Sequence, residues 1–245
     1  MIQIGAYEFR HKWGLTLTLA ILLPLGLLLG NWQMNRAEQK RNIISVYEEH
    51  AAAAITTLDG SEQDKQGMLF RQVRVHGQYD LGRQILLENQ KYKGVPGYQV
   101  FTPLRISGST GAILVNRGWI KQGDDRRFIP DLPGPLEEQL LTGRAADAPS
   151  VGIKLGPPGE SGPVWPKRLI YVDIDWIAKE VGYQLLPYIV MLPEGEADGL
   201  VRGRQSMQMQ GNMSPQKHIS YAVQWYALAG LTLLMYIVLS LKKYR

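Results

Sequence analysis

The sequence predicts a membrane protein of the α+β class, in which two transmembrane helices, one N-terminal and one C-terminal, flank a β-rich, mainly antiparallel extracytoplasmic domain. Two observations support this prediction. The chain of 245 residues is 45% hydrophobic, but its longest apolar stretches form two blocks, Trp13 to Gly30 and Tyr221 to Leu241. Between the blocks, short runs of alternating apolar and polar residues are separated by Gly and Pro, which is typical of strands.

Each apolar block is long enough to cross a bilayer. A helix rises about 1.5 Å per residue, so roughly 20 apolar residues span a hydrocarbon core about 30 Å thick. The first block contains Pro24, which membrane helices tolerate as a kink. A cleaved signal peptide is the competing interpretation, but no small-residue cleavage site follows the block. We therefore expect an uncleaved anchor.

The expected order of segments follows from these blocks. The basic tail KKYR abuts the second block, and such residues favour the cytoplasmic side. The N-terminus is too poor in Ser and Arg for a mitochondrial transit peptide, so we expect a bacterial inner membrane with the main domain in the periplasm. The predicted segments are a cytoplasmic N-terminus (1–12), transmembrane helix 1 (13–32), the extracytoplasmic domain (33–217), transmembrane helix 2 (218–241) and a cytoplasmic tail (242–245).

Charge and cysteine content exclude several classes of function. Of the 27 basic and 22 acidic residues, five basic and one acidic lie outside residues 31–220, which leaves 22 and 21 inside. A nearly neutral domain gives no support to nucleic-acid binding. The chain has no cysteine, which excludes disulfides, thiolate metal sites and cysteine nucleophiles.

The middle of the chain predicts mostly strands. From Trp32 to about Leu58 helix formers prevail, so the first transmembrane helix is expected to continue beyond the membrane. Residues 71–80 then alternate valines with Arg74 and His76, the pattern of a half-buried strand. Further strands are expected over 83–89, 97–106, 110–120, 138–147 and 183–192.

One clear helix is predicted within this domain, at DIDWIAKEVG. Asp173 or Asp175 would cap its start and Gly182 would end it, after a loop rich in Pro and Gly over residues 152–166. The two aspartates could also serve acid–base catalysis, but capping explains them more simply. Neither H-E-x-x-H nor G-x-S-x-G occurs, so we expect no enzyme.

The second apolar block carries an unusual stripe of side chains. At about 100° per residue, one face of the helix collects His218, Tyr221, Ala222, Trp225, Ala229, Thr232 and Tyr236. A plain anchor needs no such stripe, whereas a helix that faces a partner helix or a flat aromatic ligand does. The first block carries the G-x-x-x-G motif of Gly26 and Gly30, which lets helices approach closely, with Ala222 and Ala229 as candidate counterparts.

Two interpretations of His218 stay open on these grounds. With Tyr221 and Trp225 it could be an interfacial anchor at the membrane edge. It could also bind a metalloporphyrin, because neutral imidazole is a ligand of haem iron and a flat ring could pack against the stripe. Arg117, in VNRGW, likewise has two interpretations: an anion contact, or a neighbour of Gly118 in a backbone turn that needs positive φ.

Five stretches carry a resemblance to a known family: LGNWQMNRAEQK (29–40), VRVHGQYD (73–80), GYQVFTPL (97–104), VNRGWI (115–120) and HISYAVQWYALA (218–229). In order, spacing and two-helix frame they resemble the surfeit-locus family, membrane factors that assist the assembly of haem-copper cytochrome c oxidases. The chain is similar to a bacterial member.

The resemblance implies a protein that helps to insert haem a into subunit I of the oxidase, in contact with haem-synthesis and assembly proteins. In some bacterial relatives the histidine that opens the second span is implicated in haem binding, and it matches His218, the expected axial ligand of the iron. The other expected site residues are Tyr221 and Trp225 along the porphyrin, Trp32 and Gln33 from the first span, Arg117 beside a propionate and, by position only, Met34 as second axial ligand.

A second hypothesis is a non-haem membrane scaffold that stabilises an oxidase assembly intermediate. The outer domain and the aromatic stripe would then hold subunit I, and His218 would be a packing residue. A membrane-anchored hydrolase is a distant third hypothesis, because the sequence shows no nucleophile–base signature.

Overall fold

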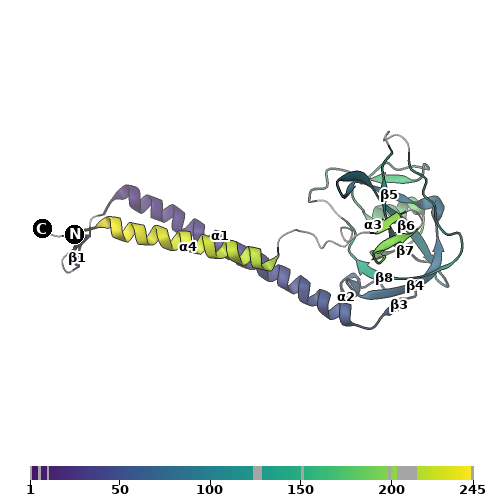
Figure 1. The fold of residues 1–245 in the computed structure, drawn as a ribbon, viewed down its shortest axis with the longest axis horizontal. Coiled ribbons are helices and arrows are strands. Elements are labelled where there is room, and N and C mark those ends of the chain that lie inside the picture. The colour runs from purple at the N-terminus through teal and green to yellow at the C-terminus, as the bar shows by residue number, and fades with distance from the viewer. Residues whose placement is uncertain are drawn as a thin grey trace. The chain divides into compact units, whose positions relative to one another are not determined.

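A computed structural model describes residues 2–4, 7–9, 11–123, 129–149, 152–197, 200–202 and 214–243 (Figure 1). The chain divides into two compact units, a helical unit of residues 1–45 and 211–245 and a β-rich unit of residues 46–210. The β-rich unit is shorter than the domain predicted over 33–217, because residues 33–45 belong to a continuing helix.

The helical unit is built on two helices that lie side by side, α1 (Trp13–Ala52) and α4 (Pro215–Ser240) (Figure 1). The predicted continuation of the first helix is confirmed, since α1 runs on to Ala52 with Pro24 inside it. Ser214 caps α4 by accepting a hydrogen bond from the Lys217 amide at 3.4 Å. The same unit contains three short strands that form an antiparallel sheet in the order β1 (Ile2–Ile4), β2 (Tyr7–Phe9) and β13 (Leu241–Lys243).

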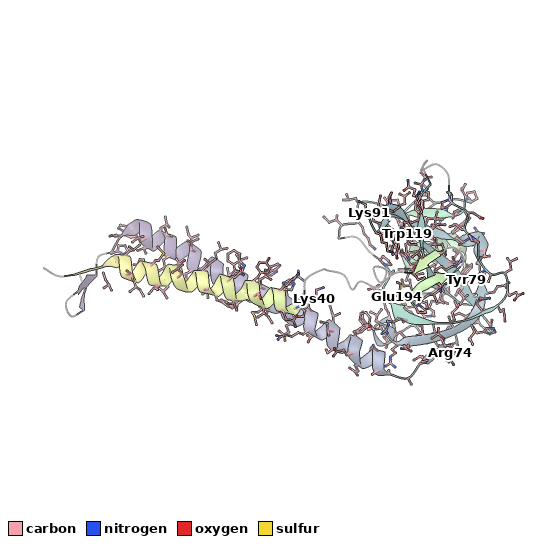
Figure 2. All side chains as sticks on the ribbon, in the orientation of Figure 1. Lys40, Arg74, Tyr79, Lys91, Trp119 and Glu194 are labelled. Atoms are coloured by element: carbon pink, nitrogen blue, oxygen red, sulfur yellow. The ribbon has the colours of Figure 1, made fainter. Side chains whose placement is uncertain are left out.

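Both helices are long and apolar enough to cross a membrane, by length and composition. Side chains project outward along both of them (Figure 2), and the exposed ones include large apolar residues such as Leu17, Ile21 and Leu28 of α1 and Val223 and Leu234 of α4. The buried residues are mostly small. Small residues inside and large apolar residues outside is the arrangement expected of paired membrane helices.

The β-rich unit is organised around a closed ring of strands. Its sheet runs in the order β11-β12-β7-β10-β8-β4-β6-β5-β9, and β6 also pairs with β7, so that β4, β6, β7, β10 and β8 close on themselves. Closure satisfies the edge hydrogen bonds that an open sheet leaves exposed. The strands are β3 (Thr56–Leu58), β4 (Gln72–Tyr79), β5 (Ile85–Tyr92), β6 (Val95–Ile106), β7 (Ala112–Lys121), β8 (Gln139–Ala146), β9 (Lys167–Leu169), β10 (Leu185–Met191), β11 (Gly195–Ala197) and β12 (Leu200–Arg202).

The predicted strands are confirmed, and so is the alternation predicted for residues 71–80, whereas β7 and β10 are buried along nearly their whole length. In β4, Val73 and Val75 are buried whereas Arg74, marked in Figure 2, and His76 are exposed. Most pairings are antiparallel, as expected, but β3 with β4, β5 with β9 and β7 with β10 are parallel. These parallel pairs join segments that are distant in sequence or separated by long connections, which local patterning does not reveal.

The core of the β-rich unit has two main parts. Inside the ring, apolar side chains from β4, β6, β7 and β10 pack together, among them Val75, Leu104, Ile113, Val115 and Tyr188. On the outer face of the ring, a second cluster packs under α3 (Ile174–Val181) and includes Phe101, Leu114, Leu169, Ile177 and Ile189. Two short helical turns follow the chain order: α2 (Lys65–Met68) lies between β3 and β4, and η1 (Leu81–Arg83) lies between β4 and β5.

Helix α3 has the caps that its sequence indicates. Asp173, rather than Asp175, is the N-cap, and its carboxylate accepts a hydrogen bond from the Trp176 amide at 3.1 Å. Gly182 ends the helix with φ of 80°, a left-handed conformation that favours glycine. The Trp176 amide, with Lys154 nearby, holds the pKa of Asp173 below its ordinary value.

We predict that Asp173→Ala destabilises α3 by about 1 kcal/mol at neutral pH, because the first-turn amide loses its acceptor. A carboxylate with a lowered pKa stabilises the fold above its unfolded pKa and loses that effect as pH falls, so the deficit should shrink below about pH 4. Hydrogen exchange of peptides covering 174–182 measures it. Asp175→Ala is the control with the smaller effect, and equal effects of the two changes would contradict the capping role.

Candidate functional site

The two helices of the helical unit meet along a seam of small residues. A Cβ atom added to Gly26 would lie 3.0 Å from Cβ of Ala229, and one added to Gly30 would overlap the ring of Tyr226. The predicted use of the G-x-x-x-G motif in helix pairing is therefore confirmed. Ala229 is one of the predicted counterparts, whereas Tyr226 faces Gly30, where an alanine was expected.

His218 lies in the first turns of α4 and contacts α1 through a hydrogen bond. It is only 9% exposed, and its Nδ1 lies 2.7 Å from Oε1 of Gln33. An amide oxygen only accepts, so Nδ1 carries the proton and donates it. The lone pair of the neutral ring is then on Nε2, which has no hydrogen-bond partner among the described residues. An imidazole held in this way can bind a metal through Nε2.

The predicted site residues of the helical unit differ in burial. Trp225 and Gln33 are half-buried, whereas Trp32 and Tyr221 are 50% and 45% exposed. The Trp32 ring lies 5.7 Å from the guanidinium of Arg36. Within the predicted stripe, His218, Ala229 and Tyr236 contact α1, whereas Tyr221 is exposed. Met34, the second ligand suggested by position, is also exposed.

Two further hydrogen bonds join the helices at other levels. The Tyr226 hydroxyl donates to Oδ1 of Asn31 at 2.7 Å, and the hydroxyls of Thr16 and Tyr236 lie 3.1 Å apart. Polar side chains in lipid need such partners. Sequence reasoning missed the Asn31–Tyr226 bond, although an asparagine directly after the G-x-x-x-G motif was a signal for it.

Arg117 belongs to the β-rich unit and is fully buried. It is the extra residue of a β-bulge in β7, where the pairing with β6 shifts register, and Gly118 beside it has φ of 131°, as one of the two interpretations expected. Its guanidinium donates to Oε1 of Gln84 at 3.2 Å and to the Pro133 carbonyl at 2.5 Å, and it lies 5.2 Å from the Tyr79 ring. These internal contacts give Arg117 a structural role.

Gln84 completes this arrangement, and sequence reasoning missed it. Its Nε2 donates to the Leu132 carbonyl at 2.9 Å, so Arg117 and Gln84 together hold the segment 129–134 against the ring. A cavity of about 450 Å³ lies beside this segment, lined by residues that include Leu81, Gln84, Pro130, Asp131 and Trp165. Across the described residues, no cluster of three His, Asp or Glu side chains could hold a metal ion.

Comparison with known proteins finds a matching family and several similar proteins. The model of the SURF1 family matches residues 20–230, a range that includes Gln33, Arg117 and His218. A SURF1-like protein of Monosiga brevicollis is 25% identical over 230 residues, which cover 87% of this chain and 83% of that protein. Surfeit locus protein 1 of Gallus gallus is 23% identical over 240 residues, covering 90% and 72%.

A yeast relative has a name that states a role. The cytochrome oxidase assembly protein SHY1 of Saccharomyces cerevisiae is 27% identical over 143 residues, which cover 54% of this chain and 36% of that protein. The match to the family model extends well beyond this shorter region, from within α1 to within α4.

The seam between α1 and α4 can be tested by cross-linking, because the chain has no cysteine of its own. We predict that Gly26→Cys with Ala229→Cys forms a disulfide, since their Cβ atoms would start 3.0 Å apart and a small adjustment gives disulfide geometry. Gly26→Cys with Gly230→Cys is the control, because Gly230 faces open space. Mass spectrometry detects the linked peptides, and equal linkage of both pairs would refute the seam.

The structural role of Arg117 predicts a large loss of stability on substitution. Arg117→Met leaves the Pro133 carbonyl without this donor and leaves Oε1 of Gln84 with the Thr102 hydroxyl alone, and we expect the free energy of unfolding of the β-rich unit to fall by about 3 kcal/mol. Limited proteolysis should then cut within 129–134. Arg105→Met, at an exposed arginine, is the control and should cost less than about 1 kcal/mol. Similar losses for both would contradict the role.

Proposed function

This chain belongs to the SURF1 family, and from that premise we propose that it is an assembly factor for haem-copper cytochrome c oxidase. The name of the yeast relative supports the assembly role. We propose further that the chain assists the delivery of haem a to subunit I, and that His218 is the axial ligand of the iron. Its partners are then subunit I and proteins of haem synthesis and oxidase assembly.

The observation that carries the haem proposal is the bond between His218 and Gln33. Histidines that bind metals usually donate the second ring N–H to an oxygen acceptor, and here Nδ1 donates to Gln33. Nε2 is thereby left with the lone pair that an iron ion needs. The donor set of the helical unit thus fits a haem, whose iron would take Nε2 as an axial ligand.

The surroundings of His218 suit a flat, apolar cargo. The exposed aromatic rings of Trp32 and Tyr221 and the half-buried ring of Trp225 offer surfaces on which a porphyrin can stack. Arg117 is not part of this proposal, because its guanidinium donates to Gln84 and Pro133 inside the β-rich unit. The chain holds and passes on its cargo rather than transforming it, so the proposed activity is not enzymatic.

The location follows from the same proposal. Two membrane-crossing helices keep the chain beside a membrane-embedded client, and the basic residues of the C-terminal tail favour the cytoplasmic side for both ends. We place the chain in a bacterial inner membrane with the β-rich unit in the periplasm. No nucleic acid is involved.

A second candidate function, the scaffold without haem, rests on the burial of His218. A side chain that is 9% exposed and bonded across a helix pair can also serve only to join the helices. On this proposal α1 and α4 present a rigid surface to subunit I. His218→Ala would then loosen the helix pair slightly and leave oxidase assembly intact.

The spectrum of the purified protein separates the two candidates. From cells that make haem A, we expect the full chain in detergent to carry a haem absorption band that His218→Ala abolishes, because the iron loses its ligand. Tyr226→Phe is the matched control: it removes the bond to Asn31, another contact between the same helices, and should retain the band. Absence of haem from the wild-type protein, with subunit I co-purifying, would favour the scaffold.

A further inference from the structure

The ligand nitrogen of His218 is selected by a residue on the other helix. We infer that Gln33 is a positioning residue that holds the His218 ring in the tautomer protonated at Nδ1 and so presents the Nε2 lone pair to an iron tetrapyrrole. The identity of that ligand rests on the proposed function, whereas the control of the tautomer does not. The observation is the Nδ1 to Oε1 distance of 2.7 Å.

Selection of the tautomer follows from the chemistry of the two groups. A neutral imidazole carries one proton, on Nδ1 or on Nε2, and only the form protonated at Nδ1 leaves Nε2 free to bind a metal. The Gln33 oxygen has lone pairs and no proton, so it accepts from the first form and repels the second. Few competing partners exist at a buried site beside lipid, where an unpaired polar atom is costly.

The position of Gln33 is itself set by the helix seam. Gly26, Gly30 and Gln33 recur at spacings of four and three residues, which places them on one face of α1. Gly26 is held against Ala229 and Gly30 against Tyr226, and these contacts fix how far α1 can slide along α4. Gln33 therefore reaches His218 because the two glycines allow close packing.

Gln33 could serve only to join α1 to α4, but positioning of the His218 ring explains its bond better. The bond from Tyr226 to Asn31 and the close contacts at Gly26 and Gly30 already join α1 to α4 without any imidazole. If Gln33 served only to join the helices, loss of its amide would resemble loss of the Tyr226 hydroxyl. If Gln33 positions the ring, loss of its amide will change the tautomer of His218, whereas loss of the Tyr226 hydroxyl will not.

The first test needs no haem. The full chain, labelled with ¹⁵N at its four histidines and purified in detergent, reports the tautomer of each ring by NMR, and His218→Ala assigns the relevant signal. We expect the wild-type ring to be protonated at Nδ1, Gln33→Leu to shift it towards Nε2, and Tyr226→Phe to leave it unchanged. An unchanged tautomer in Gln33→Leu would overturn the inference.

The second test adds haem A and measures affinity by titration. We expect Gln33→Leu to weaken binding 10- to 100-fold, the usual effect of removing the partner of a metal-bound histidine. Gln33→Glu, which keeps an acceptor and adds negative charge to it, should retain binding, raise the iron–histidine stretching frequency and lower the reduction potential. Gly26→Cys and Ala229→Cys, introduced together into the Gln33→Leu chain, should still form the disulfide, which shows that the helices still pair.

The outcomes separate this inference from the proposed function. If the wild-type chain binds no haem A while Gln33→Leu still shifts the tautomer, the haem function fails and the control of the ring by Gln33 stands. If the wild-type chain binds haem A and Gln33→Leu binds it equally, with the same iron–histidine frequency, the haem function stands and the inference fails.

Discussion

The close contact of α1 and α4 at Gly26 and Gly30 is the constraint on which the helical unit depends. Without side chains at these positions, the helices approach until Ala229 and Tyr226 touch the backbone of α1. That distance brings Gln33 within hydrogen-bonding range of His218. It also leaves the large apolar side chains exposed on the outside of the helix pair, the arrangement expected of helices that cross a membrane.

A comparable constraint governs the β-rich unit. The pairing of β6 with β7 closes five strands into a ring, and the closed ring buries one face of each strand against the others. The β-bulge at Arg117 re-aims a long cationic side chain into the interior, which is acceptable because Gln84 and Pro133 offer oxygens to it. Gly118 makes this bend possible with its positive φ. The VNRGW motif is thus explained by folding before any ligand is considered.

The two units suggest a division of labour. The chemistry that suits a metal ligand is found in the helical unit, in a histidine with one ring nitrogen committed to Gln33. The β-rich unit contributes a stable body with a cavity of about 450 Å³ beside the segment that Arg117 anchors.

Local patterns in the sequence determined much of this protein. Apolar length predicted both helices, alternation predicted the main strands, and Asp173 and Gly182 marked the ends of α3, because each signal is carried by residues close together in the chain. The helix-packing face bearing Gly26 and Gly30 was also identified in this way, whereas local pattern alone left two interpretations of His218 open.

Only the tertiary structure decided the closure of the ring, the parallel pairing of β7 with β10, the burial of Arg117 and the bond between Gln33 and His218. Each of these joins groups that are far apart in sequence. Local periodicity specifies which face of an element is apolar, but the partner of a strand or of a buried polar atom depends on how distant elements pack.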